Sequence, residues 1–261
     1  MSAVTFGHQP QLPSNRLAIG PVGVSALTDD HALVSVQHAL TQPGHLKLAF
    51  ANSHLVNLAF EDPGLSGMLS CFLVLPDGIG VDLGARILYG QPFPANLNGT
   101  DFIPALLRST VVPLRVGLLG ARPGVADRAA EAMRRFAPQH GYTVCAHGFF
   151  AAEDEPQVLT RLEAERLDLL LVAFGNPRQE QWIAGRLDHR HARVAAGVGA
   201  LFDFLAGEVP RAPAWVRRMR LEWAFRLMQE PSRLWRRYVV GNPRFLARIM
   251  VQKWRGVPRF P

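Results

Sequence analysis

The sequence is poor in cysteine. Only Cys71 and Cys145 occur in a chain of 261 residues, and no Cys-x-x-Cys pair is present. A disulfide framework and a zinc–cysteine site are therefore excluded as the basis of the fold, and a reducing compartment is expected. Long apolar runs are also missing, because no stretch approaches the roughly 18–20 residues that a membrane-spanning helix needs. The first 15 residues lack the basic start and apolar core of a secretory signal, so we expect none.

Several catalytic motifs are missing as well. The sequence contains no His-Glu-x-x-His motif, no phosphate-binding P-loop and no Gly-x-Ser-x-Gly motif. His54, His140 and His147 show no metal-ligand spacing, which favours solvated or core roles for them. These absences argue against zinc peptidases, P-loop nucleotide hydrolases and serine hydrolases.

The composition is that of a folded protein, with 48% hydrophobic and 19% charged residues. Disorder, collagen and small disulfide scaffolds are thereby excluded. The length fits one large domain, or one domain with an appendage.

Charge is distributed unevenly along the chain. The net charge is +7, but residues 211–261 hold 13 Arg and Lys against only Glu222 and Glu230. The preceding part is mildly acidic. Four of the five tryptophans also lie in this last fifth of the chain. The pattern predicts an anionic partner for the C-terminal segment: a phosphate-bearing ligand, a nucleic acid or an acidic membrane surface.

Short apolar runs alternate with amphipathic stretches as far as Gly199. Near-continuous apolar strands such as Leu169–Phe174 are typical of a parallel sheet that is buried on both faces. Strands alternating with helices predict an α/β, Rossmann-like doubly wound fold with a mostly parallel sheet. We expect strands at 16–23, 46–51, 71–75, 114–119, 142–146, 169–174 and 194–198, and helices that include 29–41, 125–136 and 177–187.

The strands end near Gly207, and prolines divide the remainder into short segments. We expect helices at 215–229, 232–240 and 243–254, with Phe245, Ile249 and Trp254 as an apolar stripe. The predicted organisation is a catalytic core over residues 1–208 and a basic, Trp-rich helical appendage over residues 209–261, with the boundary near 208–212.

Asp77 is the first candidate for chemistry. It follows an apolar strand and precedes Gly78 and Gly80, and ligands of doubly wound sheets bind at the carboxyl ends of the strands. A carboxylate on such a loop can reach a substrate hydroxyl as a general base. An Asp-Gly turn with no catalytic role is the alternative.

Three other strand ends carry polar or glycine-rich sequences. Asn52 can bind a ligand or cap the next helix, and for the residue alone capping is favoured. Gln179 and Glu180 stand in the first turn of a helix after Gly175-Asn176-Pro177, where an acid also offsets the helix dipole. The glycines of the segment 196–203 can either make close packing contacts or leave space for the phosphate or the nucleobase of a ligand.

Two rival functions rest on single features. Gly78-x-Gly80-x-x-x-Gly84, with Asp101 about twenty residues on, imperfectly resembles the fingerprint of a nicotinamide-dependent oxidoreductase. Its third glycine is one position late, so the match to this fingerprint is poor. The basic tail alone also fits a nucleic-acid-binding module, which predicts retention on DNA or RNA with a steep salt dependence. The acidic body and the tryptophans favour a membrane surface instead.

An ordered series of motifs, spanning about residues 46–246, resembles the WecG/TagA/CpsF glycosyltransferases, glycosyltransferase family 26. The segments that carry the resemblance are Pro76-Asp77-Gly78-x-Gly80-Val81, Gly99-Thr100-Asp101, Gly175-Asn176-Pro177-Arg178-Gln179-Glu180-x-Trp182, Gly197-Val198-Gly199-x-x-Phe202-Asp203-Phe204-x-x-Gly207, Arg211-Ala212-Pro213-x-Trp215 and Glu222-Trp223-x-x-Arg226-Leu227-x-x-Glu230-Pro231-x-Arg233-Leu234-x-Arg236-Arg237.

The resemblance implies a metal-independent, inverting hexosyltransferase with no cofactor. It would move a sugar from a UDP-sugar co-substrate (UDP-N-acetylmannosamine or UDP-glucose) to a sugar linked to a polyprenyl diphosphate such as undecaprenyl diphosphate. The β-linked product would serve exopolysaccharide, other cell-surface polysaccharide or teichoic-acid synthesis. The implied location is cytoplasmic, peripheral on the inner face of the cytoplasmic membrane. The expected partner there is an anionic membrane surface, and no nucleic acid is expected as a partner. The sequence leaves homo-oligomerisation open.

By motif position, Asp77 resembles the catalytic base. The substrate-binding residues implied in the same way are Asn52, Asp101, Gln179, Glu180, Arg226, Arg233 and Arg236, with the three arginines on the diphosphate. No Asp-x-Asp motif is present to hold a metal, and arginine forks bind phosphate bidentately. The sequence departs from the family at Phe50, where threonine is common, and at Asn96, where arginine is common. These departures leave the sugar specificity open.

Overall fold

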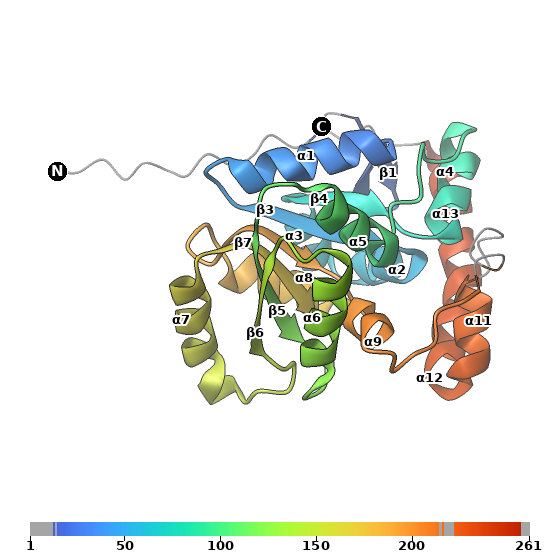
Figure 1. Ribbon diagram of the computed structural model, residues 1–261. Helices are drawn as coiled ribbons and strands as arrows, with labels where there is room; N and C mark the ends of the chain where they lie inside the picture. Colours follow the sequence, from blue (N-terminus) through green and yellow to red (C-terminus); the bar gives the residue numbers. More distant parts are fainter. Residues whose placement is uncertain (1–12, 14, 214–215, 217–221, 257–261) are drawn as a thin grey trace. The chain divides into compact units, whose positions relative to one another are not determined.

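The structure, a computed structural model, describes residues 13, 15–213, 216 and 222–256, with Arg233 described by its backbone alone. It has a mixed α/β fold built on a six-stranded parallel sheet of order β4-β3-β8-β7-β5-β6 (Figure 1). The predicted Rossmann-like fold is confirmed. The strands of this sheet are β3 (Leu46–Ala51), β4 (Phe72–Pro76), β5 (Arg115–Gly120), β6 (Gly141–Ala146), β7 (Leu167–Ala173) and β8 (Ala192–Gly197).

Apolar composition explains why the central strands lie where they do. All seven residues of β7 are buried, as expected for a strand that is covered on both faces. β7 pairs in parallel with β5 on one side and with β8 on the other. Gly117 of β5 lies against this packing, because a methyl group there would stand 2.4 Å from Leu167 Cδ1.

The expected strand at 16–23 is instead two short antiparallel strands, β1 (Arg16–Ile19) and β2 (Val22–Ser25), in a sheet of their own. Gly20 forms the turn between them with a φ of +60°. A glycine adopts this left-handed conformation without the steric cost that other residues bear. The apolar run alone gave no sign of this turn.

By their internal contacts, the described residues divide into two units. Unit 1 contains Asp30–Ala49 and Gly99–Glu208, and unit 2 contains Pro13–Asp29, Phe50–Asn98 and the described part of Val209–Pro261. The C-terminal segment therefore groups with the strand tip that carries Asp77.

Unit 1 holds most of the sheet and its helices. α6 illustrates why the helices form: Val125, Ala126, Ala129, Ala130 and Met133 are its buried residues, and their spacing places them on one face. The observed bounds of α1 and α6 are those expected. The helices of this part of the chain are α1 (Asp29–Thr41), α5 (Gly99–Ser109), α6 (Val125–Phe136), the short 3₁₀ helix η1 (Ala152–Asp154), α7 (Glu155–Glu165), α8 (Arg178–Arg186) and α9 (Leu201–Leu205).

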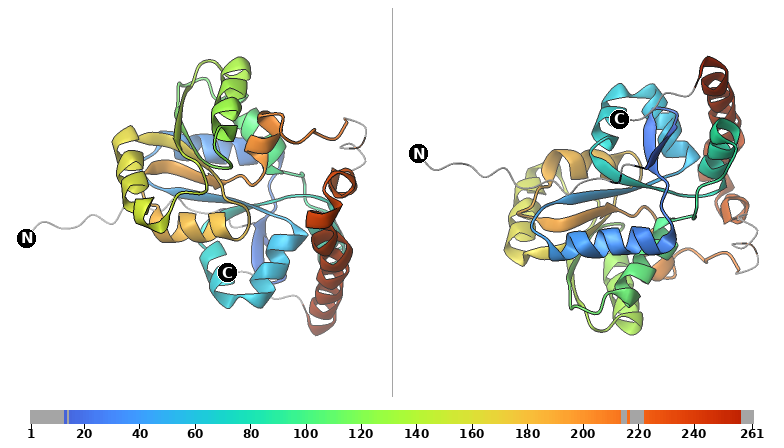
Figure 2. Two further views of the ribbon diagram at one scale, coloured as in Figure 1. Left: turned by 90° about the horizontal axis from the view of Figure 1, so that it is seen from below. Right: turned by 90° about the horizontal axis from the view of Figure 1, so that it is seen from above.

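Unit 2 includes the C-terminal helix α13 (Gly241–Arg255), which packs against α2 (Ser53–Glu61) and α4 (Ile79–Tyr89) (Figures 1 and 2). Phe245 and Ile249 of α13 are 1% and 0% exposed, so they form the buried stripe. Trp254, expected on the same stripe, is 87% exposed. The remaining helices of this unit are α3 (Pro63–Leu69), α11 (Glu222–Gln229), α12 (Pro231–Trp235) and the π-helix η2 (Arg236–Val240).

Polar contacts fix α13 along its length. Gln252 accepts a hydrogen bond from the backbone N–H of Gly20 and donates one to the carbonyl of Ala18. Arg248 donates to Asn57 and to Glu61. These contacts hold the helix in one register against the rest of unit 2, in addition to its apolar stripe.

Candidate functional site

Asp77 stands on the first loop position after β4. Its backbone N–H donates to the carbonyl of Ala51 at 2.8 Å, so the end of β4 is tied to the end of β3. Gly78 follows with a φ of +87° and begins α4 as its N-cap residue. The chain therefore turns sharply at Asp77, which leaves its side chain partly exposed at a strand tip.

Asn52 connects the second strand end to this carboxylate. Its Oδ1 accepts from the backbone N–H groups of His54 and Leu55, each at 3.1 Å, which caps α2. Its Nδ2 donates to Oδ2 of Asp77 at 3.4 Å. The capping interpretation is confirmed, and the same side chain also orients the candidate base.

Asn96 supports the other side of the loop. Its Oδ1 accepts from the backbone N–H of Gly78 at 2.7 Å. The next residue, Leu97, donates its N–H to the carbonyl of Pro76 at 2.9 Å. The residues on both sides of Asp77 are therefore held. Sequence reasoning noted Asn96 as a departure but did not predict this contact.

A third link joins the loop region to the C-terminal segment. Ser53 Oγ donates to Oδ1 of Asn242 at 2.7 Å, and Asn57 Nδ2 donates to the carbonyl of Gly241 at 2.8 Å. Gly80 of α4 passes close to Ser53, since a methyl group there would lie 3.0 Å from Ser53 Cβ. The first turns of α2, α4 and α13 thus meet within unit 2.

His54 lies in the first turn of α2, beside Asn52. Burial, and to a lesser extent the positive charge of Arg237, lower the pKa of its imidazole to about 4, although Glu61 acts in the opposite direction. The imidazole is therefore neutral at neutral pH. Arg237 belongs to η2, so this coupling brings a C-terminal arginine close to the loop region. The sequence signalled Arg237 only as the neighbour of Arg236.

The predicted diphosphate arginines occupy α11, α12 and η2. Arg226 is half-buried on α11. Arg236 is exposed, with its guanidinium carbon 5.4 Å from the ring centroid of Trp235. The side chain of Arg233 lies outside the described residues. All three positions belong to unit 2, as Asp77 does.

Gln179 and Glu180 lie in the first turn of α8 in unit 1, and both are buried, at 2% and 0% exposed. Gln179 Oε1 accepts from the backbone N–H groups of Gly175 at 3.2 Å and Gly199 at 3.0 Å. A methyl group at Gly197 would stand 2.8 Å from Gln179 Nε2, so close packing explains that glycine. The prediction placed Gln179 on the substrate, and the structure shows its amide bonded to the protein.

Glu180 accepts at Oε1 from Asn176 Nδ2 at 2.6 Å and from Gln179 Nε2 at 2.8 Å. Burial raises the pKa of this carboxyl to about 7. Its Oε2 is buried and has no hydrogen-bond partner among the described residues. An uncharged acid tolerates such a site far better than a carboxylate does.

Asp101 is exposed in the first turn of α5 in unit 1. A carboxylate there complements the positive end of the helix dipole. The structure brings Asp77 together with Asn52, and Gln179 with Glu180.

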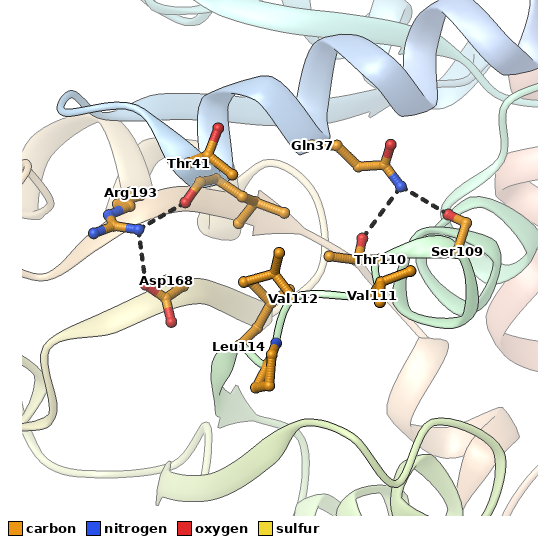
Figure 3. A pocket seen from close by; sticks show the side chains of 11 residues that line it. Gln37, Thr41, Ser109, Thr110, Val111, Val112, Leu114, Asp168 and Arg193 are labelled. Carbon is orange, nitrogen blue, oxygen red and sulfur yellow. Dashed lines mark hydrogen bonds and ion pairs between the residues drawn. The ribbon is translucent and has the colours of Figure 1, made fainter.

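A cavity of about 440 Å³ lies at another edge of unit 1 (Figure 3). Leu114, Asp168 and Arg193 line it from the amino-terminal ends of β5, β7 and β8, whereas Gln179 contacts the loops after the carboxyl ends. Asp168 lies 3.2 Å from Arg193 Nη1, and Gln37 donates to Ser109 Oγ at 3.0 Å. Its polar groups thus bond to one another, which favours a structural role. Across the described ranges, no cluster of three or more His, Cys, Asp or Glu side chains is arranged to hold a metal ion.

Comparison with known proteins gives consistent results. Residues 17–259 match the family described as Glycosyl transferase WecG/TagA/CpsF family. Three relatives carry the name N-acetylglucosaminyldiphosphoundecaprenol N-acetyl-beta-D-mannosaminyltransferase. The Bacillus spizizenii protein is 31% identical over 77% of each chain. The Bacillus subtilis protein is 27% identical over 83% of this chain and 84% of its own. A Staphylococcus aureus protein is 28% identical over 80% of this chain and 81% of its own. The chain belongs to the WecG/TagA/CpsF family of glycosyl transferases.

Proposed function

We propose that this protein transfers a sugar from a UDP-sugar to a hydroxyl of a sugar carried on polyprenyl diphosphate, inverting the anomeric centre to form a β linkage. The relatives' names support a lipid-linked N-acetylglucosamine as acceptor and N-acetylmannosamine as the transferred sugar. UDP-glucose is the alternative donor to UDP-N-acetylmannosamine. The observation that carries the proposal is the carboxylate of Asp77 at a strand tip, oriented by Asn52.

Asp77 acts as the general base in this reaction. Its carboxylate takes the proton of the acceptor hydroxyl while that oxygen attacks the anomeric carbon, and the bond to the UDP oxygen breaks on the opposite face. A base must lie in a fixed position for such a transfer. The contacts of Asn52 with Asp77 and of Asn96 with Gly78 provide that fixed position.

Negative charge develops on the departing UDP, and the C-terminal segment supplies the cations that stabilise it. Arg226, Arg233 and Arg236 are the proposed contacts, because guanidinium groups bind diphosphate oxygens bidentately. A direct displacement assisted in this way needs no metal. Transfer is therefore expected to persist in EDTA, and loss of activity on chelation would contradict this part of the proposal.

The acceptor is attached to lipid, and we assign the exposed part of α13 to membrane contact. No helix within the described ranges is both long and apolar enough to cross a bilayer. Met250 and Trp254 are four residues apart on one face of α13, at 56% and 87% exposed. Arg255 follows directly. Exposed tryptophan beside basic residues is typical of interfacial binding to anionic lipid. The proposed location is the inner face of the cytoplasmic membrane, where UDP-sugars are available.

The test is a panel of UDP-sugars offered with short-chain polyprenyl-diphosphate sugars, with release of UDP and formation of the lipid product measured together. The expected result is release that depends on the acceptor, with UDP-N-acetylmannosamine or UDP-glucose preferred. NAD and duplex DNA serve as control ligands. Binding of either in place of UDP would overturn the assignment.

A further inference from the structure

A single amide side chain joins two loops that follow the central strands of unit 1. Gln179 Oε1 accepts from the backbone N–H of Gly175, two residues after β7, and from that of Gly199, two residues after β8. Each of these N–H groups would otherwise need another acceptor. The carbonyl end of Gln179 therefore holds both loops in one mutual arrangement.

Glu180 determines which end of the Gln179 amide faces the loops. A carboxyl oxygen that accepts from Gln179 Nε2 turns Oε1 toward the glycine N–H groups. The reversed amide would direct its NH₂ at two backbone donors. Asn176 Nδ2 donates to the same oxygen at 2.6 Å, so Glu180 also holds the loop residue that follows Gly175.

Packing keeps both side chains away from a ligand. At 2% and 0% exposed, Gln179 and Glu180 present almost no surface, and Gly197 closes the space beside Gln179. They can affect a bound molecule only through the loops that they hold. Gly175 and Gly199 are partly exposed and have open space where a side chain would stand, so a ligand can approach these two loop positions.

We infer that Glu180 is a positioning residue: by orienting Gln179, its carboxyl oxygen fixes the loops after β7 and β8 so that their backbone binds the sugar nucleotide. The identity of that ligand rests on the proposed function. The hydrogen-bonded relay from Glu180 through Gln179 to the two glycines rests on the structure alone.

The test compares Glu180→Gln, which keeps an accepting oxygen, with Glu180→Leu, which removes it at similar volume. Gly197→Ala displaces Gln179 from its other side and leaves Glu180 in place. Glu155→Gln is the matched control, because Glu155 accepts from Trp182 Nε1 and contacts Arg186 elsewhere on α8.

Two measurements are made on the full chain, with folding of each variant checked by circular dichroism. Amide hydrogen exchange of the segments containing Gly175 and Gly199 tests the relay without any ligand. Titration with UDP, together with KM for the UDP-sugar and kcat, tests whether the relay supports binding of the sugar nucleotide. We expect Glu180→Leu and Gly197→Ala to speed exchange at both loops and to weaken UDP binding about tenfold, with a smaller change in kcat. Glu180→Gln and Glu155→Gln stay within about threefold of wild type.

Unchanged loop exchange in folded Glu180→Leu would overturn the relay, as would a Glu180→Gln protein impaired as severely as Glu180→Leu. Faster exchange with unchanged UDP affinity would overturn the role in ligand binding. If the wild-type protein binds no UDP, the proposed function fails, and the exchange measurement still decides whether the relay exists.

Discussion

The Nδ2 of Asn52 lies 3.4 Å from Oδ2 of Asp77, while Oδ1 of the same amide caps α2. One side chain thereby couples the start of a helix to the orientation of the proposed base. Substitutions at Asn52 and Asp77 can separate helix capping from base catalysis. The cap needs only a hydrogen-bond acceptor at position 52, whereas the base needs a negative charge at position 77.

Asp77→Asn is expected to keep the fold and lower transfer by roughly 10²–10⁴-fold, because the amide cannot take the acceptor's proton. The measurement is kcat with the lipid-linked acceptor, alongside the melting temperature. Asp127→Asn, an exposed position on α6, is the control. Turnover near the wild-type rate in Asp77→Asn would remove this residue from the base role.

Asn52→Asp is expected to keep the helix cap but to shift the pH dependence of transfer. Aspartate caps a helix as well as asparagine does, but here it sets a second negative charge beside Asp77. A like charge raises the pKa of the base, which must be ionised to work, so the acid limb of kcat/KM moves to higher pH. Asn52→Ala, by contrast, loses the cap at a cost of about 1 kcal/mol. An unshifted limb in Asn52→Asp would show that the two side chains do not interact during catalysis.

Phe245→Ala is expected to lower the free energy of unfolding by about 3–5 kcal/mol, the usual range for a buried phenylalanine. Phe245 is 1% exposed, and its Cζ stands 3.1 Å from where a methyl group at Gly84 would lie. Denaturant titration gives the value. Because the lost contacts are those of α13 with α4, transfer activity should fall in parallel, and a stable, fully active variant would contradict the packing argument.

Trp254→Ala should behave in the opposite way. The ring is 87% exposed, so the free energy of unfolding stays within about 0.5 kcal/mol of wild type. Sedimentation with anionic vesicles should show binding weaker by roughly five- to thirtyfold, which corresponds to about 1–2 kcal/mol of lost interfacial burial. Vesicles of neutral lipid are the control for charge. Equal sedimentation of wild type and variant would exclude this face of α13 from membrane contact.

Glu180→Gln is expected to change how stability depends on pH. The pKa of Glu180 is raised from 4.5 to about 7 in the folded protein, so between these values the folded state holds a proton that the unfolded state has released. The contribution of Glu180 to the free energy of unfolding is therefore fully present below about pH 4.5 and is lost as the pH rises through about 7. This contribution amounts to about 3 kcal/mol.

The difference between Glu180→Gln and wild type isolates this contribution. His45 and His54, whose pKa values burial lowers to about 4, act in the opposite direction, but they do so equally in both proteins. Denaturant titrations at pH 4.5 and 7.5 measure the difference. Parallel pH profiles for the two proteins would show that the Glu180 proton is not linked to folding.

Much of the fold could be predicted because local patterns dominate it. The apolar run of β7 predicts a buried strand, and the amphipathic pattern of α6 predicts a helix with one buried face. Pro243, in contrast, suggested that the last helix begins at that residue, whereas α13 begins two residues earlier, at Gly241. A proline in the first turn has no intrahelical N–H bond to lose, so the helix tolerates it. The π-helical turn of η2 likewise left no pattern in the sequence.

The arrangement of the candidate site could be predicted in part. Asp77 and Asn52 were predicted as site residues because polar residues follow two strands, and the structure places the two side chains in contact. Their roles in transfer stay predictions. The contacts of Gln179 could not be predicted, because the sequence shows the same residue whether the amide binds a ligand or accepts from backbone N–H groups. Asn96 and Arg237 were missed for a related reason, since their neighbours depend on how distant segments pack.

The packing of α13 against α2 and α4 also has a consequence for how the protein is made. Unit 2 is assembled from three stretches of chain separated by the sequence of unit 1. During synthesis, the loop of Asp77 emerges long before the helix that buries its supporting elements. The proposed base therefore acquires its final setting only after residues near 255 have left the ribosome, and a chain clipped ahead of α13 would be released without it.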